Sequence, residues 1–282
     1  MSGAVQSGLG RLGWLLFPDD CRICERPLQN LSRIPVCPSC LQVARPETAT
    51  HVCRVCQSPF TDAYPLDEQD LCTVCRGREV SFDRAYSFGS YEGSLRELIR
   101  VFKYSRIESL AKPLARMLLE ALPADREFDL VVPMPMHWFR RWQRGFNQAE
   151  LLARPVARFA GLRCDCVLKR VRLGKRQAGL GATARRTNLQ GAFRVLRPDR
   201  VKGKRILLID DVLTTGSTLA AAAGVLKRAG AAEVCALTVA RVARRSSLPG
   251  PAPRRKKRVI TRTEHGKSRE EGADYGDYRT TS

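Results

Sequence analysis

A short apolar run that leads directly into two carboxylates and a hydroxyl-rich turn is the strongest constraint on the fold. Residues 206–209 are all aliphatic, Asp210 and Asp211 follow them, and Thr-Thr-Gly-Ser-Thr occupies positions 214–218. A continuous aliphatic run of this kind is typical of a strand that is covered on both faces. Helical spacing of apolar residues then begins at Leu219, so the sequence predicts a strand, a turn and a helix in succession.

The same alternation of strand-like and helical patterns extends through residues 81–243. Apolar residues recur at helical spacing in the segments 95–102, 110–121, 149–159 and 219–226. Short strand-like runs occupy 129–133, 164–168, 205–209 and 234–239. Pro155 is expected to kink or interrupt the third helix, and Gly230 is expected just beyond the end of the fourth. The predicted fold is therefore α/β, a parallel sheet flanked by helices.

The turn after the two carboxylates has the chemistry of a phosphate site. It consists of Thr214, Thr215, Gly216, Ser217 and Thr218. Its hydroxyls, its backbone N–H groups and the N-terminus of the following helix can together hold a phosphate monoester. Asp210 and Asp211 can accept hydrogen bonds from ribose hydroxyls one sugar length away. Each part has an ordinary alternative, an Asp-Asp turn or a helix N-cap, but their order after a strand favours a sugar-phosphate site.

Eight of the eleven cysteines occur in four Cys-x-x-Cys pairs. The pairs are Cys21 and Cys24, Cys37 and Cys40, Cys53 and Cys56, and Cys72 and Cys75. Two pairs supply four thiolates, a tetrahedral set that suits structural Zn²⁺ and leaves no open position for catalysis. Sequential pairing into two zinc ribbons is the simplest arrangement, and interleaved pairing or disulfides are the alternatives. Cys164, Cys166 and Cys235 lie in strand-like runs and are expected to be buried.

Composition divides the chain into three regions. They are a small Cys- and Pro-rich module at 1–80, the α/β domain at 81–243, and a polar, basic tail at 244–282 that is expected to be disordered. The net charge is +21, of which residues 138–205 carry +16 and the tail carries +6. A clustered positive field attracts polyphosphates or nucleic acid, although a solvated surface is the alternative.

The chain has no apolar run long enough for a membrane span. The apolar segment 9–17 contains Arg11 and is not followed by a cleavage-like sequence, so a secretory signal is not expected. Paired cysteines without an export signal favour metal in a reducing compartment, and we therefore expect a cytoplasmic protein.

Residues 206–218 resemble the phosphoribosyl-diphosphate (PRPP) signature of type I phosphoribosyltransferases at every position. The wider arrangement resembles the ComF family (competence protein F, amidophosphoribosyltransferase-like). The motifs that match are the paired cysteines, Lys103-Tyr104, Val132-Pro-Met-Pro135, Arg144-Gly-Phe-Asn-Gln148, Arg186-x-Asn188 and Gly191-Ala-Phe193. The resemblance covers roughly residues 12–242, and Pro155 and the basic tail depart from it.

The resemblance implies a role for each matching segment. Asp210 and Asp211 would hold the ribose of PRPP, and the 214–218 turn would hold its 5-phosphate. The turn that meets the diphosphate would contain Pro133 and Met134, with cations from Lys103, Arg140, Arg141 and Arg144. Segment 174–186 would form a mobile hood loop. The implied reaction transfers the phosphoribosyl group from PRPP, bound with Mg²⁺, and releases diphosphate.

A nucleic-acid-associated protein for DNA uptake, with the pocket as a PRPP or nucleotide sensor, is the alternative function. The basic segment and tail would then bind phosphates independently of sequence. Trp138, Phe139 and Trp142, beside arginines, are the one sign of a base-stacking surface, and packing in the core or the anchoring of a loop explains them at least equally well. His137 follows the turn that would meet the diphosphate and is expected to have a structural role, with contact to the ligand as the alternative.

Overall fold

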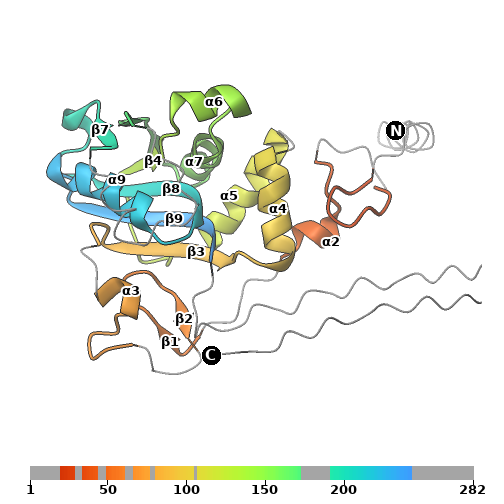
Figure 1. The fold of residues 1–282 in the computed structure, drawn as a ribbon, viewed down its shortest axis with the longest axis horizontal. Helices are drawn as coiled ribbons and strands as arrows, with labels where there is room; N and C mark the ends of the chain where they lie inside the picture. Colours follow the sequence, from red (N-terminus) through yellow and green to blue (C-terminus); the bar gives the residue numbers. More distant parts are fainter. Residues whose placement is uncertain are drawn as a thin grey trace, which may run out of the picture.

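The computed structural model describes residues 20–28, 34–43, 49–60, 66–76, 80–104, 107–172 and 191–242. At its centre is a five-stranded parallel sheet with the strand order β3-β9-β8-β4-β5 (Figure 1). The strands are β3 (Arg84–Ser90), β4 (Leu130–Pro133), β5 (Arg163–Cys164), β8 (Arg205–Leu213) and β9 (Glu233–Arg241). Strand β9 is buried along nearly its whole length, as a strand covered on both faces must be.

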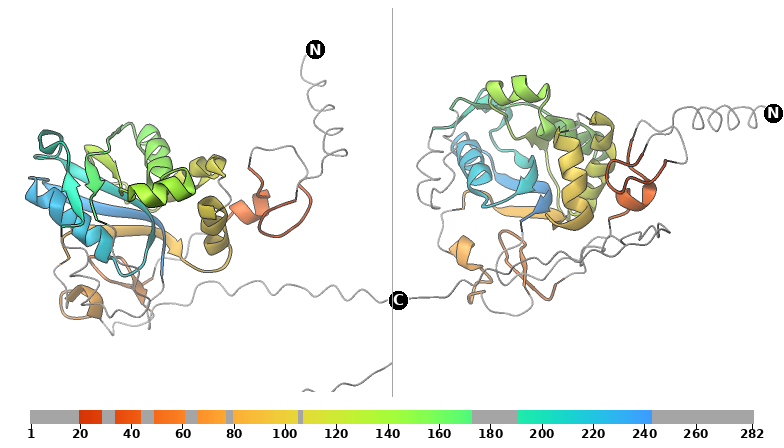
Figure 2. Two further views of the ribbon diagram at one scale, coloured as in Figure 1. Left: turned by 45° about the horizontal axis from the view of Figure 1, so that its top comes forward. Right: turned by 45° about the vertical axis from the view of Figure 1, so that its right-hand side comes forward.

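Helices cover both faces of the sheet and give it three layers (Figure 2). One face carries α4 (Gly93–Tyr104), α5 (Ala111–Glu120) and α7 (Gln148–Phe159), and the other carries α9 (Ser217–Arg228) and a hairpin of β6 (Leu168–Arg170) and β7 (Phe193–Val195). Shorter elements are η1 (Glu108–Leu110), α6 (Trp138–Arg144) and η2 (Pro198–Arg200). The predicted fold class is confirmed. None of the helices in these described ranges has the length and apolar character that a membrane crossing requires.

The apolar positions predicted from helical spacing are buried in these helices. Those of α4 and α9 are Leu95, Leu98, Ile99, Phe102, Leu219, Ala222, Ala223 and Leu226. Phe159 is an exception, because it is 43% exposed at the end of α7, where the Arg116 guanidinium lies over its ring. Gly230 has a φ of +91°, as expected just beyond the end of α9.

Helix α7 continues through Pro155, so the expected interruption does not occur. Proline removes one backbone donor from a helix. Leu152 and Val156, on either side of it, are fully buried against the sheet. This packing stabilises the helix despite the missing hydrogen bond.

The prediction of one strand over 164–168 is also wrong, because β5 ends at Cys164 and β6 begins only at Leu168. Asp165 still donates its backbone N–H to β4, but its carboxylate binds Arg197 and Arg200. Beyond Asp165 the chain leaves the main sheet and pairs with β7.

Two cysteine-rich segments attach to different parts of the α/β domain (Figure 1). The first, with α2 (Pro38–Leu41), packs on α4 and contributes buried residues to the core there. The second contains β1 (His51–Val52), β2 (Pro59–Phe60) and α3 (Thr73–Arg76). It lies beside the edge strand β3, where the Ala85 N–H donates to the Val55 carbonyl at 2.8 Å. The domain boundaries expected at 80 and 243 stay predictions, and the tail lies outside the described residues.

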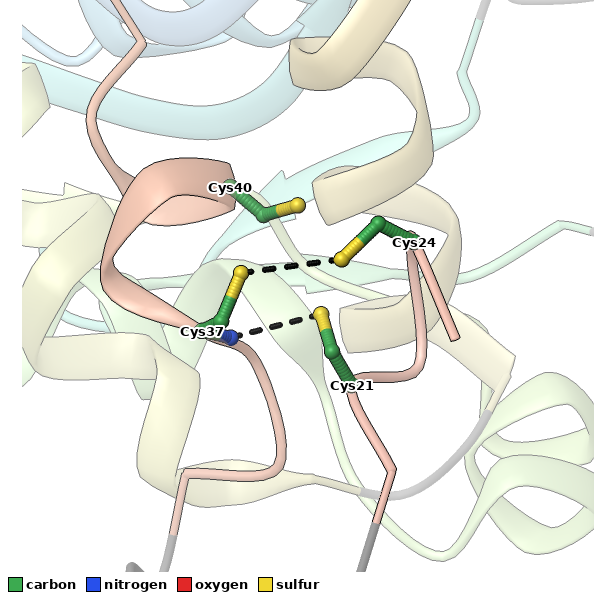
Figure 3. A group of neighbouring side chains, drawn as sticks. All are labelled: Cys21, Cys24, Cys37 and Cys40. Carbon is green, nitrogen blue, oxygen red and sulfur yellow. Dashed lines mark hydrogen bonds between the residues drawn. The ribbon is translucent and has the colours of Figure 1, made fainter. Parts of the chain in front are cut away.

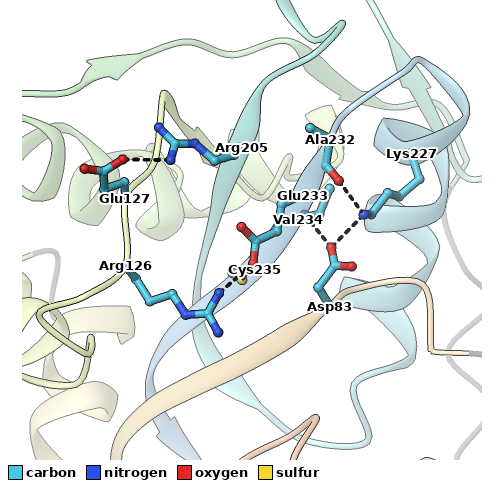
Figure 4. A network of polar contacts seen from close by, with 9 residues as sticks. All are labelled: Asp83, Arg126, Glu127, Arg205, Lys227, Ala232, Glu233, Val234 and Cys235. Atoms are coloured by element: carbon cyan, nitrogen blue, oxygen red, sulfur yellow. Dashed lines mark hydrogen bonds and ion pairs between the residues drawn. The ribbon is translucent and has the colours of Figure 1, made fainter.

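Ion pairs link the ends of the sheet at which β8 and β9 begin (Figure 4). Arg205 binds Glu127 at 2.9 Å and Asp129 at 3.0 Å, Arg126 binds Glu233 at 3.3 Å, and Lys227 binds Asp83 at 2.7 Å. Hydrogen bonds from Arg205 lower the pKa of Asp129 to about 2. This network fixes the strands at the end of β8 opposite Asp210 and Asp211.

Candidate functional site

The two adjacent carboxylates lie within β8 and not at its end. Strand β4 stops at Pro133, which pairs with Ile209, whereas β8 continues beside β9 as far as Leu213. The ladder with β9 therefore extends the strand beyond its predicted limit. Among the described residues, no strand pairs with the β4 edge of β8 beyond Ile209, and Asp210 and Asp211 lie on this open part.

Side chains alternate along a strand, so Asp210 and Asp211 face opposite sides of the sheet. Asp211 faces α4, and its Oδ1 is 2.9 Å from Lys103 Nζ. Asp210 faces α9, and its carboxylate accepts a hydrogen bond from the Asp211 backbone N–H at 2.9 Å. Burial and the negative charge of Asp211 raise the pKa of Asp210 to about 7.

The 214–218 loop turns the chain from β8 into α9. Gly216 has a φ of +77°, a left-handed conformation that favours glycine, and it caps α9. The hydroxyls of Thr215 and Ser217 lie 3.1 Å apart. A hollow is lined by Asp210, Val212, Leu213, Thr214, Gly216, Thr218 and Leu219. Because the free N–H groups and the dipole of a helix N-terminus attract anions, this hollow can hold a negatively charged group.

Asn147 fixes the turn that follows β4. Its amide donates to the Met134 carbonyl at 3.1 Å, and its side-chain oxygen accepts from the Ala149 N–H at 3.2 Å to cap α7. Met134 is buried, and its own N–H donates to the Ile209 carbonyl at 2.8 Å. From the sequence alone, Asn147 was identified only as part of a motif. An asparagine directly before a helical pattern is an N-cap signal that could have identified it.

Helix α6 exposes its aromatic side chains. His137 is buried, and its Nδ1 accepts from the Phe139 N–H at 3.3 Å to cap the helix. Trp138, Phe139 and Trp142 are 70%, 40% and 78% exposed, and Phe139 lies 6.0 Å and 6.5 Å from the two indole rings. The alternative that these three residues pack in the core is therefore wrong.

Of the cations expected to bind the diphosphate, the two whose side chains the structure describes bind carboxylates of the chain itself. Arg141 is 60% exposed and lies 3.6 Å from Glu150, and Lys103 binds Asp211. The side chains of Arg140 and Arg144, and the whole of segment 174–186, lie outside the described part of the structure. The assignment of these groups to a diphosphate stays a prediction.

The paired cysteines converge in two clusters, as sequential pairing predicts. The first cluster is Cys21, Cys24, Cys37 and Cys40, and the second is Cys53, Cys56, Cys72 and Cys75. Within each, the four sulfurs lie within 4.8 Å of one another, and Figure 3 shows the first cluster. Cys24 and Cys37 sulfurs are 3.7 Å apart, and those of Cys56 and Cys72 are 3.8 Å apart. Zn–S bonds of about 2.3 Å give tetrahedral edges of about 3.8 Å, so both clusters fit structural zinc.

The two clusters repeat one backbone arrangement. The residue after the first pair, Glu25 or Gln57, has a left-handed φ of 59° or 53°. Its N–H donates to the carbonyl four residues earlier at 2.8 Å in both cases. The third cysteine donates its N–H to the sulfur of the first, at 3.3 Å and 3.4 Å respectively. Hydrogen bonds to ligand atoms of this kind orient them for metal binding.

The three remaining cysteines differ in burial. Cys235 is buried as expected, but Cys164 is half-buried and Cys166 is exposed, so the prediction fails for these two. Cys166 lies in the break between β5 and β6, outside any strand, and Cys164 is the last residue of β5, which is an edge strand of the sheet. Burial raises the pKa of Cys164 to about 11, which keeps its thiol protonated.

A family profile first indicates the class of this domain. The family profile described as "Phosphoribosyl transferase domain" matches residues 143–275, which include β8, the 214–218 loop and α9. Glutamine PRPP amidotransferase from B. subtilis, solved with ADP and GMP, is 25% identical with a TM-score of 0.33, and the match covers 46% of this chain and 26% of that one.

Relatives along most of the chain then define the family. The DNA utilization protein YhgH of Escherichia coli O6:H1 is 36% identical over 227 residues, which are 78% of this chain and 96% of that protein. Competence protein F of Haemophilus influenzae is 35% identical over 171 residues, which are 58% of this chain and 75% of that protein. The chain belongs to the ComF/YhgH family of proteins with a phosphoribosyltransferase domain.

Proposed function

We propose that this protein binds PRPP at the open part of β8 and transfers its phosphoribosyl group to a nitrogenous acceptor. The observation that carries the proposal is the hollow in which Asp210 meets the 214–218 loop at the N-terminus of α9. The N–H groups and hydroxyls of the loop would bind the 5-phosphate. Asp210 and Asp211 would accept hydrogen bonds from the ribose hydroxyls. The match to the phosphoribosyltransferase domain supports this class of ligand.

In the proposed reaction, a nitrogen lone pair forms a bond to C1 of PRPP while the bond from C1 to the diphosphate oxygen breaks. The electron pair of that bond leaves with diphosphate, and the acceptor nitrogen loses its proton to solvent. The chain would contribute chiefly position and charge, because positive charge develops at the ribose and negative charge on the leaving group. When bound, Mg²⁺ would offset the charge of the diphosphate, and the carboxylates of Asp210 and Asp211 are the ligand type that it prefers.

Lys103 has two possible partners in this scheme. In the structure it binds Asp211, and ribose hydroxyls would replace it there as hydrogen-bond donors. Lys103 would then be able to face the diphosphate together with Arg141 and Arg144. The turn of Pro133 and Met134, anchored to β8 through the Met134 N–H, would lie beneath that group.

Calorimetric titration of Mg²⁺ and PRPP into Asp210→Asn and Asp211→Asn tests the site. We expect each variant to bind at least about tenfold more weakly than the wild type, which is about 1.4 kcal/mol. Asp165→Asn is the matched control, because Asp165 forms ion pairs in the same domain, with Arg197 and Arg200, but lies outside the hollow. Equal binding by the wild type and both site variants would refute the assignment. Diphosphate release with candidate acceptors then separates turnover from binding.

A second candidate function is binding of single-stranded nucleic acid at α6. Its exposed Trp138, Phe139 and Trp142 offer ring faces on which bases can stack, and the exposed Arg141 between them can bind phosphate. The names of the relatives, a DNA utilization protein and a competence protein, are consistent with this function.

Gel-shift titration of a single-stranded oligonucleotide at two salt concentrations tests the second candidate. We expect the Trp138→Ala/Trp142→Ala double variant to bind at least about tenfold more weakly. Phe159→Ala is the control, since Phe159 is an exposed aromatic residue on a different helix. No shift of the wild type at low salt would exclude this function.

A further inference from the structure

Arg241 is a buried cation that connects the second cluster to the end of the main sheet. It is the last residue of β9 and is 5% exposed. Its Nη2 donates to the carbonyl of Cys56, a member of the second cluster. A buried guanidinium needs a compensating negative charge. Four thiolates around Zn²⁺ carry a net charge of about −2, so a metal-loaded second cluster supplies that charge beside Arg241.

Arg241 is also attached to the start of the 214–218 loop. It pairs with Leu213, the last residue of β8, and the following Val242 donates its N–H to the Leu213 carbonyl at 2.9 Å. Thr214, the first residue of the loop, directly follows Leu213. The starting point of the loop therefore depends on the end of β9, which Arg241 holds to the second cluster.

Phe82 provides an independent connection between the cluster and the loop. A Cβ added to Gly216 would lie 3.7 Å from the Phe82 ring and 3.5 Å from Leu213 Cδ1. Val80, two residues before Phe82, packs both on the second cluster and on the core beneath α9. The segment that supports Gly216 is thus itself packed on the second cluster.

We propose that metal binding at the second cluster orders the 214–218 loop, with Arg241 as the positioning residue. Metal binding fixes the backbone around Cys56, which fixes the ends of β9 and β8 and hence the loop. The use of this loop for phosphate rests on the proposed function, but the coupling itself does not. The first cluster packs on α4 at a different part of the domain, so it serves as an internal control.

Hydrogen exchange measured by mass spectrometry on the full chain, without ligand, tests the coupling. The reading is the exchange rate of peptides that span residues 213–219. We expect Cys72→Ser, which removes a ligand of the second cluster, to raise that rate at least about tenfold. Cys24→Ser, the equivalent loss at the first cluster, is expected to leave it unchanged. Zinc content, measured in parallel, is expected to fall by one ion per chain in both variants.

Substitution of Arg241 separates the positioning role from simple loss of metal. Arg241→Met is expected to raise the exchange rate of residues 213–219 and to speed zinc release from the second cluster only. Arg241→Lys keeps the charge, so we expect both rates to return part of the way to those of the wild type. Arg205→Gln is the matched control, because it breaks an ion pair at the start of the neighbouring strand β8, at the opposite end of the sheet from Arg241. If Arg241→Met unfolds as a whole, the exchange rates of residues 213–219 in Arg241→Lys and Cys72→Ser still test the coupling.

Two results would overturn the proposal: unchanged exchange of 213–219 in Cys72→Ser and Arg241→Lys, or an equal rise in Cys24→Ser. Failure of the wild type to bind PRPP, with the exchange results as expected, would instead overturn the proposed function and leave the coupling in place.

Discussion

Lys103 Nζ and Asp211 Oδ1 are 2.9 Å apart, and both side chains are largely buried, at 17% and 15% exposed. The pair neutralises one of the two adjacent carboxylates of β8. The other, Asp210, feels the charge of both partners, because Asp211 raises its pKa and Lys103 lowers it. Breaking or rearranging this ion pair therefore changes the pKa of Asp210.

Binding of Mg²⁺ and PRPP is expected to weaken as the pH falls through about 7. The pKa of Asp210 is raised to about 7, so its carboxylate is charged above this pH and protonated below it. Only the charged form attracts cations and accepts hydrogen bonds through both oxygens. Calorimetric titration at a series of pH values measures the effect.

Variants separate the contribution of Asp210 to this pH dependence from that of PRPP. The ionisation of PRPP itself is the same for every variant. Lys103→Met removes the cation that lowers the pKa of Asp210, so the midpoint is expected to move to higher pH. Asp210→Asn is expected to bind weakly with a flatter pH dependence. An unshifted midpoint in Lys103→Met would contradict the electrostatic link.

Asp129→Asn is expected to lower the melting temperature of the protein by about 2–4 °C at pH 7. Asp129 accepts hydrogen bonds from the Arg205 backbone N–H at 2.8 Å and from its guanidinium at 3.0 Å, which together fix the start of β8. Its pKa is lowered from 3.8 to about 2, so its stabilisation is complete above 3.8 and is lost as the pH falls through 2. Thermal unfolding at pH 7 and pH 5 should show the same difference from wild type. Glu127→Gln, at a 78% exposed side chain, is the control and should change little.

Asn147→Ala is expected to cost about 1–2 kcal/mol of unfolding free energy, because it removes both a helix cap and a buried hydrogen bond. Asn147→Asp keeps the cap on α7 but loses the donor to the Met134 carbonyl. If the Met134 turn forms part of the ligand site, the affinity of Asn147→Asp for PRPP should fall. The fall should be larger than the loss of folded protein in this variant accounts for. Denaturant unfolding together with PRPP titration distinguishes the two roles.

Metal analysis of the purified protein is expected to find about two zinc ions per chain. Cys40→Ser and Cys75→Ser each disrupt one of the two clusters and should each leave about one ion. Cys166→Ser changes an exposed cysteine outside both clusters and should keep two. A folded wild type that contains no zinc and is indifferent to chelators would contradict the structural role of the clusters.

Local patterns in the sequence predicted the layers of the fold and both clusters. The aliphatic run before Asp210, the helical spacing in α4 and α9, and the spacing of the cysteine pairs are each properties of a few neighbouring residues. The burial of Phe102 and Leu219 followed from spacing alone.

Features set by distant parts of the chain were not predicted. The length of β8 depends on β9 beside it, and the end of β5 depends on Arg197 and Arg200, more than 30 residues away. The continuity of α7 through Pro155 depends on how tightly its neighbours pack. The contact between Arg241 and Cys56 joins positions 185 residues apart, and no local pattern marks it.

The short length of β4 has a consequence for any molecule that touches Asp210 and Asp211 together. Neighbouring side chains on a strand point to opposite faces of the sheet. Such a molecule therefore has to pass around the edge of β8 that β4 leaves unpaired. A variant in which β4 ran alongside β8 for two more residues would keep the whole 206–218 motif. Its longer β4 would nevertheless cover the edge of β8 across which one ligand can reach both carboxylates.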